Sequence, residues 1–373
     1  MTGHDGGDAP VEPRRVLVAT TVHHPHDARI LHRQIAALLD AGWEVTYVAP
    51  FEADASRPEG IRTVPVPRAS GRRRLRALRD ARRTLRRLAP DHDLILIHDP
   101  DLLPAVWRLA REQPVVWDVH EDTAAAVDDR AWIPTSLKGF ARWIVRRVER
   151  RTERRLNLIL AEESYRDRFR GDHPVIPNRP WSPSSPGAPT GDPRVIYVGR
   201  LSRGRGLVEL VALGERLQPG TVVTLVGAVD DTDRELLETA SRNGKVDWRG
   251  FLPNDQALEL VRGSVCGLSL LHDDPNYHGS MPTKVLEYLA HGVPAITTPL
   301  PLARDLVEGH HAGFVVPFED VETTATLVTR LVEDQQLQRR LGANGYRAVQ
   351  DELGWERVVP RFLRSLEEAH VHA

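Results

Sequence analysis

One short stretch of the sequence combines a lysine and a glutamate with strong helix boundaries. Residues that favour a helix start stand at Pro282–Thr283, and residues that favour a helix end stand at Gly292–Pro294. Lys284 would lie in the first turn, where its charge opposes the helix dipole unless an anion binds there. Glu287 follows on the same face, and a carboxylate can accept two hydroxyl hydrogen bonds. The pattern predicts a diphosphate at the helix start and a ribose at Glu287. The alternative is a surface Lys–Glu pair on an ordinary amphipathic helix.

A second candidate phosphate site follows the first apolar run of the second half. Val198–Leu201 leads through Arg205 and Gly206 into a predicted helix at Leu207. Arginines beside a helix start can hold a diphosphate by charge, and the free backbone N–H groups add hydrogen bonds. Glycines at such strand ends let a ligand approach the backbone closely. The segment is not a Rossmann G-x-G-x-x-G motif, and as a glycine-rich pattern alone it is weak.

Histidines and acids gather after three apolar runs of the first half. They are His23, His24, His26 and Asp27, then His98 and Asp99, then His120 and Glu121. Because the carboxyl ends of parallel strands meet at one edge, these side chains can form a polar wall that binds hydroxyl groups and moves protons near neutral pH. The alternative is that each histidine satisfies its own loop. No pair has the spacing of a known zinc helix or finger, so no metal is expected.

The elements that must position these residues alternate along the chain. Short apolar runs, interleaved with helical patterns, occur at 15–19, 44–49, 94–97, 115–119 and 156–161, and again at 195–198, 221–226, 246–248, 265–270, 295–297 and 314–316. This alternation predicts an α/β fold in which parallel sheets are covered by helices on both faces. Each set of runs predicts one doubly wound, Rossmann-like sheet.

A proline-rich stretch separates the two sets of strands. Its composition can continue neither a helix nor a central strand, so we place the domain linker at 176–193. The predicted organisation is a disordered tail at 1–14, an N-terminal domain at 15–175 and a C-terminal domain at 194–350. A C-terminal helix at 351–373 is expected to return to the N-terminal domain.

Composition narrows the class of protein. The chain has 373 residues, of which 41% are hydrophobic and 27% charged, with a net charge of −2. These values are ordinary for a globular enzyme and argue against a protein built around nucleic acid. No apolar run approaches the roughly 20 residues of a membrane-spanning helix, and the first residues lack the apolar core of a secretory signal. Cys266 is the only cysteine. We therefore expect a cytoplasmic protein with a buried strand thiol.

With these residues in view, the chain resembles the retaining family 4 glycosyltransferases (glycosyltransferase group 1) along nearly all of its length. The motifs that carry the resemblance are Asp27–Ile30 with Ala41–Val45, Asp118–Glu121, Ile176–Asn178, Val198–Leu201, Arg249–Phe251, Pro282–Lys284, Glu287–Ala290 and Gly292–Pro294. The resemblance implies a GT-B fold, in which two Rossmann-like domains face each other across a cleft.

The resemblance also implies an activity: transfer of a sugar from a UDP- or GDP-sugar to a hydroxyl acceptor, with retention of anomeric configuration by front-side attack. The enzyme would then act in the synthesis of a glycan, a glycolipid or a glycosylated metabolite. By this resemblance Glu287 binds the ribose, Arg200, Arg205 and Lys284 neutralise the diphosphate, and His120 lines the sugar cleft. The donor-binding set would be Gly199, Arg200, Arg205, Gly250, Phe251, Met281, Pro282, Thr283, Lys284, Val285 and Glu287. On the acceptor side would be His23, His24, His26, Asp27, His98, Asp99 and Glu121. No metal or cofactor is implied, since the nucleotide sugar is a substrate.

One departure from the family pattern concerns the donor sugar. Many members have two glutamates eight positions apart, but Gly279 stands eight positions before Glu287. Backbone groups from Gly279 to Thr283 would then carry more of the sugar binding. A second departure is Arg205–Gly206, where many members have Lys-Gly, and it keeps the charge. In addition, the loop His23–His26 occupies the place of a glycine-rich pair after the first strand.

Two arginine-rich segments allow a further interpretation. Ten arginines lie between Arg68 and Arg87, interleaved with leucines at helical spacing, and Phe140–Arg155 mixes aromatic and aliphatic residues with arginines. Either segment could lie on anionic lipid at the inner face of the membrane, which suits a lipid-linked acceptor. The alternative is an ordinary helix that packs an apolar stripe on the sheet, and we favour this for Phe140–Arg155.

Two other classes of function stay open. A sugar-nucleotide 2-epimerase would share the fold, and a non-catalytic membrane-surface or nucleic-acid-binding protein would share the basic segments. Nucleic acid is not expected as a partner, given the net charge.

Overall fold

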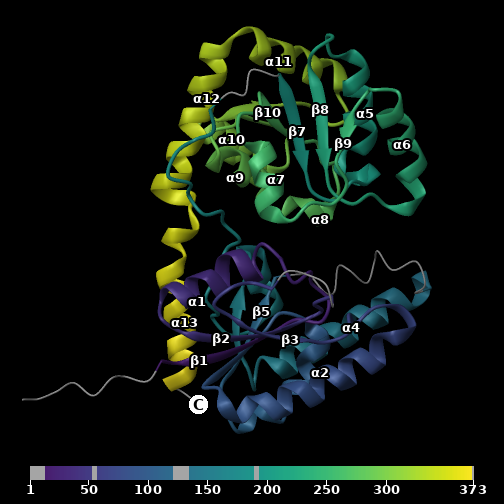
Figure 1. Cartoon of the computed structure of the whole chain (residues 1–373). Helices are drawn as coiled ribbons and strands as arrows, with labels where there is room; N and C mark the ends of the chain where they lie inside the picture. The colour runs from purple at the N-terminus through teal and green to yellow at the C-terminus, as the bar shows by residue number, and fades with distance from the viewer. Residues whose placement is uncertain (1–12, 53–56, 121–133, 189–192, 372–373) are drawn as a thin grey trace, which may run out of the picture. The chain divides into compact units, whose positions relative to one another are not determined.

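The computed structural model describes residues 13–52, 57–120, 134–188 and 193–371 (Figure 1). The chain divides into two compact units, one formed by Met1–Ile176 together with Pro360–Ala373 and the other by Pro177–Val359. The first division falls one residue after the predicted end of the N-terminal domain. The second unit extends past the predicted limit of residue 350 to Val359.

The first unit contains a six-stranded parallel sheet. Its strands are β1 (Arg15–Ala19), β2 (Glu44–Ala49), β3 (Arg62–Pro65), β4 (Leu94–Ile97), β5 (Val115–Val119) and β6 (Asn157–Leu160). Their order in the sheet is β3-β2-β1-β4-β5-β6, which is that of a doubly wound Rossmann-like sheet. The strand order reverses direction between β1 and β4, and ligands of such sheets collect at that point beyond the carboxyl ends of the strands.

The helices of the first unit are α1 (Ala36–Asp40), α2 (Arg74–Leu88), α3 (Leu103–Val106), α4 (Thr135–Thr152) and α13 (Val359–Val371). A π-helical stretch, Ile30–Ile35, leads into α1. In α13 the side chains of Phe362 and Leu366 are fully buried, and Glu367 accepts a hydrogen bond from Arg14 at 2.8 Å. Arg14, which we assigned to the disordered tail, therefore has a defined partner. Residues 1–12 of that predicted tail lie outside the described residues.

The second unit repeats the same sheet topology. Its strands are β7 (Arg194–Val198), β8 (Val222–Val226), β9 (Asp247–Trp248), β10 (Cys266–Ser269), β11 (Ala295–Thr297) and β12 (Gly313–Val315). The order β12-β11-β10-β7-β8-β9 is again parallel throughout and reverses between β7 and β10. Cys266 is buried in the central strand β10, as its apolar setting predicts.

Helices cover both faces of the second sheet. They are α5 (Leu207–Arg216), α6 (Arg234–Arg242), α7 (Asn254–Val261), α8 (Pro275–His278), α9 (Thr283–Ala290), α10 (Pro301–Gly309), α11 (Val321–Glu333) and α12 (Gln335–Ala348). Figure 1 shows α5 and α6 on one side of β7–β9 and α9 and α10 on the other. Successive residues of β7 alternate between these layers, because Val195 and Tyr197 pack with α5 whereas Ile196 packs with α9.

Every predicted strand is present within a residue or two of its expected limits, but β3 was not predicted. It lies at an edge of the first sheet with the sequence Arg-Thr-Val-Pro, and none of its residues is fully buried. An edge strand that buries little carries no continuous apolar signal.

The two arginine-rich segments form helices that bury very different faces. Helix α2 buries Ala77, Ala81 and Leu85. It is therefore an ordinary amphipathic helix that carries arginines on its remaining surface. Helix α4 instead leaves Phe140 60% and Trp143 56% exposed. The expectation that Phe140–Arg155 packs its apolar residues on the sheet is therefore wrong. No helix within the described ranges is long and apolar enough to cross a membrane.

Candidate active site

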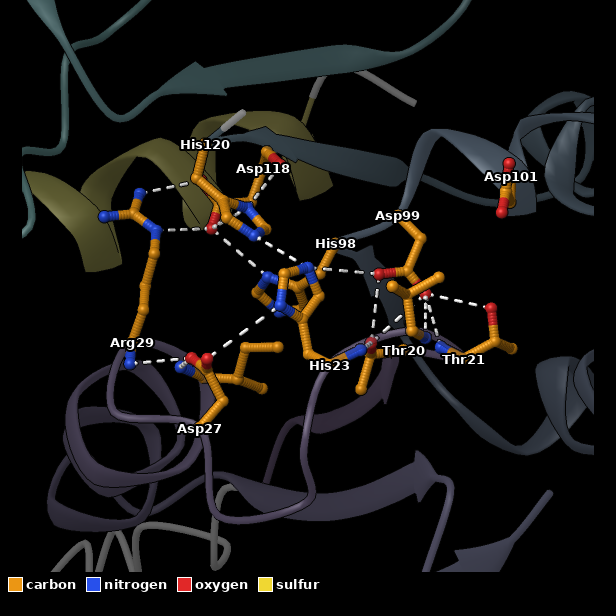
Figure 2. A network of polar contacts seen from close by, with 12 residues as sticks. Thr20, Thr21, His23, Asp27, Arg29, His98, Asp99, Asp101, Asp118 and His120 are labelled. Carbon is orange, nitrogen blue, oxygen red and sulfur yellow. Dashed lines mark hydrogen bonds and ion pairs between the residues drawn. The ribbon is translucent and has the colours of Figure 1, made fainter. Parts of the chain in front are cut away.

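The polar wall predicted in the first unit forms where β1, β4 and β5 end. These strands are neighbours in the sheet. The residues that directly follow them therefore lie at the same edge of the sheet; they are Thr20, His98 and His120. Figure 2 shows the rings of His98 and His120 close together and the Thr20 side chain directed to Asp99, the residue after His98. This edge is the point at which the strand order reverses, where ligands of such folds bind.

Asp118 is the centre of this network. The carboxylate is completely buried in β5 and accepts two hydrogen bonds from Arg29, each at 2.7 Å, and one from Gln34 at 2.9 Å. Arg29 also donates to the carbonyl of Ile176 at 3.0 Å. Burial would raise the pKa of Asp118, but the charge and hydrogen bonds of Arg29, with those of His120 and His98, hold it well below its usual range. Asp118 is therefore a fixed negative charge.

Two histidines share the Asp118 carboxylate but respond to it differently. His98 Nδ1 lies 3.2 Å and His120 Nδ1 3.5 Å from Asp118 Oδ2. Burial lowers the pKa of His98 despite the nearby carboxylate. Burial also opposes the charged form of His120, but the hydrogen bond and charge of Asp118 outweigh it and raise the pKa of His120. Of the two rings, His120 is the better proton carrier.

His120 is hydrogen-bonded to His23. The Nε2 atoms of the two rings are 3.0 Å apart, so one must donate a proton and the other accept it. His23 Nε2 also lies 3.4 Å from Asp99 Oδ1, and its Nδ1 lies 3.9 Å from Asp27 Oδ2. Burial would raise the pKa of Asp27, but His23 and the backbone N–H of Ile30 lower it. The chain from Asp118 through the two rings to Asp99 can hold and move a proton.

The loop after β1 is itself held by Asp99. This buried carboxylate accepts hydrogen bonds from the hydroxyls of Thr20 and Thr21 and from the backbone N–H groups of Thr21 and Val22. The loop is thus tied to the end of β4. As a result His23 has a fixed place beside His120.

Not every predicted residue of the wall joins the network. His24 and His26 pair locally, since the backbone N–H of His26 donates to His24 Nδ1 at 3.1 Å. Glu121 lies outside the described residues. Sequence reasoning missed Arg29 and Gln34 and did not select Asp118 as a site residue. A signal was present, because an aspartate within the apolar run Val115–Val119 needs a buried partner.

The group His98, Asp118 and His120 has ligand atoms within 4.8 Å of one another, close enough to hold a metal ion. However, both oxygens of Asp118 already accept hydrogen bonds from Arg29, and Gln34 donates to one of them. A cation would have to displace this guanidinium or bind beside its charge. The donor set fits an ion-pair network better than a metal site.

In the second unit, Tyr288 anchors helix α9 against the sheet. Its hydroxyl accepts a hydrogen bond from the backbone N–H of Val198 at 3.0 Å and donates to the carbonyl of Leu268 at 3.1 Å. The ring lies over Gly267, where a Cβ would be 2.2 Å from the ring carbon Cδ2. Tyr288 therefore bridges β7 and β10 where the strand order of the second sheet reverses, and it holds α9 against these two strands.

Lys284 occupies the first turn of α9 and is buried, with 9% of its surface exposed. Its Nζ lies 3.7 Å from the centre of the Tyr197 ring. Within the described part of the chain, no atom accepts a hydrogen bond from this ammonium. Burial, followed by the charge of Arg205, lowers the pKa of Lys284 well below its usual value, against the opposing effect of Glu287. A buried ammonium without an acceptor is unfavourable, so this position favours an anionic ligand.

The glycines and arginines after β7 adjoin Lys284. A Cβ on Gly199 would lie 3.3 Å from Lys284 Nζ, so the backbone approaches the ammonium closely. The guanidinium of Arg200 is bound to Asp230 at 2.6 Å. For Arg205 no ion pair with a carboxylate is found among the described residues. Arg205 rather than Arg200 thus supplies a second uncommitted cation, in contrast to the equal roles that we predicted for them.

The alternative of a surface Lys–Glu pair on α9 is wrong. Every residue from Lys284 to Ala290 is buried, including Glu287 with 6% exposed, and Glu287 Oε1 accepts a hydrogen bond from Asn254 at 3.4 Å. Ahead of the helix, Met281 and Pro282 are half-buried, as is Thr283 at its start, whereas Val285 is buried in the core.

The predicted donor residues Gly250 and Phe251 follow β9. The carbonyl of Gly250 accepts a hydrogen bond from the backbone N–H of Gly227 at 2.7 Å, and Phe251 is 58% exposed.

Comparisons with known proteins agree with this two-part arrangement. The sequence model described as "Glycosyl transferases group 1" matches residues 179–348, and that described as "Glycosyl transferase 4-like domain" matches residues 28–179. The chain is 29% identical over 164 residues to the putative teichuronic acid biosynthesis glycosyltransferase TuaC of Bacillus subtilis, covering 44% of this chain and 39% of TuaC. The chain thus spans about two fifths of that relative.

Two further similarities extend over most of the chain. Phosphatidyl-myo-inositol mannosyltransferase of Mycolicibacterium smegmatis is 26% identical over 326 residues, which cover 82% of this chain and 80% of that protein. The structure of Anabaena HepE in complex with UDP-glucose superposes with a TM-score of 0.69 at 14% identity, covering 95% of this chain and 99% of that one.

Proposed function

Because this chain belongs to the group 1 glycosyltransferases and has their GT-B fold, we propose that it transfers a sugar from a nucleoside diphosphate to a hydroxyl acceptor. The donor would bind in the second unit at the amino end of α9. The acceptor would bind to the polar network of the first unit. The observation that carries the proposal is the buried ammonium of Lys284, which no hydrogen-bond acceptor satisfies within the described residues.

A diphosphate would complete the electrostatics of this site. It would supply the acceptor that Lys284 lacks and would place negative charge next to Arg205 and the first N–H groups of α9. As the bond to the sugar breaks, charge builds on the departing diphosphate, and fixed cations stabilise that charge without reorganising. Lys284 and Arg205 would therefore act on the leaving group.

Glu287 and the histidines would serve the hydroxyl groups of the substrates. The Glu287 carboxylate is nearly buried, one turn along α9 from Lys284, where it can accept both hydrogen bonds of a ribose diol. In the first unit the Nε2 atoms of His23 and His120 bind each other, so a sugar or acceptor hydroxyl would bind by inserting between the two rings, where it would meet one donor and one acceptor. With no carboxylate nucleophile assigned, we propose retention by front-side attack, in which the departing phosphate oxygen takes the proton of the acceptor.

The first experiment identifies the nucleotide. The full chain is melted with UDP, GDP, ADP or TDP, because a ligand that binds only the folded state raises the melting temperature. UDP is the first choice, since the HepE structure holds UDP-glucose. One nucleotide should stabilise the parent, and the Lys284→Met variant should lose this effect. If none of the four stabilises the parent, the proposed donor site is wrong.

The second experiment tests the reaction. The sugar form of the preferred nucleotide is incubated with candidate hydroxyl acceptors, and NMR of the product reports the anomeric configuration. Retention with acceptor-dependent release of nucleotide supports the proposal, whereas inversion refutes front-side attack. An epimerised or free sugar formed from the donor alone would instead identify a sugar-nucleotide 2-epimerase.

A further inference from the structure

Helix α4 exposes an unusual number of large apolar side chains. Only Glu149 and Thr152 are buried along its 18 residues. Leu137 is 53%, Phe140 60%, Trp143 56%, Ile144 43% and Val148 41% exposed. A helix that rests on a sheet normally turns such residues inward, as α2 does with Ala77, Ala81 and Leu85. The exposed apolar face of α4 therefore needs a partner.

The exposed residues form one continuous face. Leu137, Phe140, Ile144 and Val148 follow one another at spacings of three and four residues, so they lie along one side of the helix. Trp143 extends this side, with its ring stacked on Phe140 at a centroid distance of 5.8 Å. An 18-residue helix is about 27 Å long, so this face is long enough for an extended contact.

Arginines border this apolar face toward the carboxyl end of α4. Together with Trp143 they line a hollow of about 430 Å³, formed by Arg146, Arg147, Arg150, Arg151, Arg154 and the nearby Arg170. The one acidic residue of α4 balances little of this charge, because Glu149 is buried, is paired with Arg168 and lies near only Arg146 of the hollow, at 4.0 Å. The Arg147 guanidinium lies 5.7 Å from the centre of the Trp143 ring.

We propose that α4 is a membrane-contact helix that lies flat on an anionic lipid surface, with its apolar side chains among the acyl chains and its arginines on the lipid phosphates. The combination of features selects this partner. Leucine, isoleucine and valine side chains gain nothing from a nucleic acid backbone but gain much from an acyl interior. Arginines on long stems reach the headgroup level beside a buried apolar face. This inference concerns binding alone and stands independently of sugar transfer.

Helix α2 provides the internal control. It is richer in arginine, with seven in 15 residues against five in the 18 residues of α4, but its apolar stripe Ala77, Ala81, Leu85 and Leu88 is buried. Arg79, Arg86 and Arg87 are exposed there, as Arg147, Arg150 and Arg151 are on α4. If charge alone caused binding, removing three arginines from either helix would have the same effect. If α4 is the contact, the two triple variants will differ.

The test measures binding of the full chain to vesicles of phosphatidylglycerol and phosphatidylcholine in equal parts, and to vesicles of phosphatidylcholine alone. Each arginine at an anionic surface contributes on the order of a fivefold increase in partitioning. The variant R147Q/R150Q/R151Q should therefore bind the anionic vesicles on the order of 100-fold more weakly, and R79Q/R86Q/R87Q only a few-fold more weakly. Because all six side chains are exposed, both variants should melt like the parent.

A second variant separates apolar insertion from electrostatics. Phe140→Ser/Ile144→Ser keeps every charge and should still weaken binding at least about tenfold, most clearly at high salt where charge is screened. The proposal is overturned if both arginine variants weaken binding equally or if Phe140→Ser/Ile144→Ser binds like the parent. It also fails if single-stranded DNA binds the parent while anionic vesicles do not, or if soluble glycerophosphate binds at the arginine hollow as tightly as the vesicles.

Discussion

Replacing Lys284 by methionine tests the donor site through two effects of opposite sign. Methionine keeps the length of the side chain but removes the ammonium. Without a ligand, the ammonium is buried with no acceptor among the described residues, a situation that costs about 1–3 kcal/mol. Its contact with the Tyr197 ring returns about 0.5–2 kcal/mol. The balance of these two ranges runs from about 1 kcal/mol of destabilisation to about 2.5 kcal/mol of stabilisation, so without ligand the variant should be at least nearly as stable as the parent.

Nucleotide binding should change in the other direction. A hydrogen bond to a charged group contributes about 1.5–3 kcal/mol, so the variant should bind the preferred nucleoside diphosphate about 10- to 150-fold more weakly. Calorimetric titration gives the affinity, and thermal melting gives the stability. For a unit of this size, each kcal/mol corresponds to about 2–4 °C.

The protonation of Lys284 supplies an independent signature. Because its pKa in the free protein lies well below the ordinary value, the unfolded chain binds more protons between these two pKa values. The stability of the unliganded parent therefore rises with pH across this window, and a bound diphosphate, which raises the pKa again, takes up a proton. Calorimetry in buffers of different ionisation enthalpy measures that uptake, which the methionine variant should lack.

Lys245 gives the matched control. It lies in the turn that enters β9, at the opposite end of the strands from the α9 site. Lys245→Met should leave nucleotide affinity unchanged. The reasoning is refuted if Lys284→Met destabilises the unliganded protein by more than about 2 kcal/mol while its nucleotide affinity stays that of the parent, because Lys284 would then be a structural residue.

Further predictions concern both units. Glu287→Ala should weaken nucleotide binding by about 1–3 kcal/mol through loss of the ribose contact, and unchanged affinity in calorimetry would remove this assignment. Asp118→Asn should destabilise the first unit by about 3–5 kcal/mol in urea unfolding, because Arg29 keeps its buried charge without a carboxylate; a loss below 1 kcal/mol would contradict this. Since the pKa of Asp118 is depressed, its contribution is complete above the ordinary carboxyl pKa of about 4 and is lost as pH falls through the folded value, so the acid limb of the parent stability curve should flatten in the variant. Gly206→Ala should destabilise the second unit by about 1–3 kcal/mol, because φ at this residue is 84° and a Cβ would lie 2.4 Å from the carbonyl oxygen of Leu270. A melting temperature equal to that of the parent would contradict this and would show that the loop adapts.

Local sequence patterns determined the strands and their grouping into two sheets. Runs such as Leu94–Ile97 are buried on both faces, so their apolarity is continuous and visible without a structure. The edge strand β3 was missed because it buries little. The helix from Thr283 was visible as well, since helix starts and stops are set by residues next to it in the chain.

Side-chain partners distant in sequence could not be read in the same way. Arg29 and Asp118 are 89 positions apart, and only the strand order β1-β4-β5 brings the loop before α1 to the end of β5. Likewise, spacing could not show that Arg200 is paired with Asp230 while Arg205 has no ion pair within the described ranges. Such pairings depend on which strands are neighbours, which a single sequence does not specify.

The faces of α2 and α4 show the same division. The sequence determined that both helices carry arginines beside apolar residues, since a helical period needs only local spacing. Whether the apolar stripe is buried depends on the surface against which the helix packs, and only the tertiary structure decided it: α2 turns its stripe inward and α4 does not. The burial of Lys284 was decided in the same way, because Tyr197, β7 and β10 surround α9 only after the chain has folded.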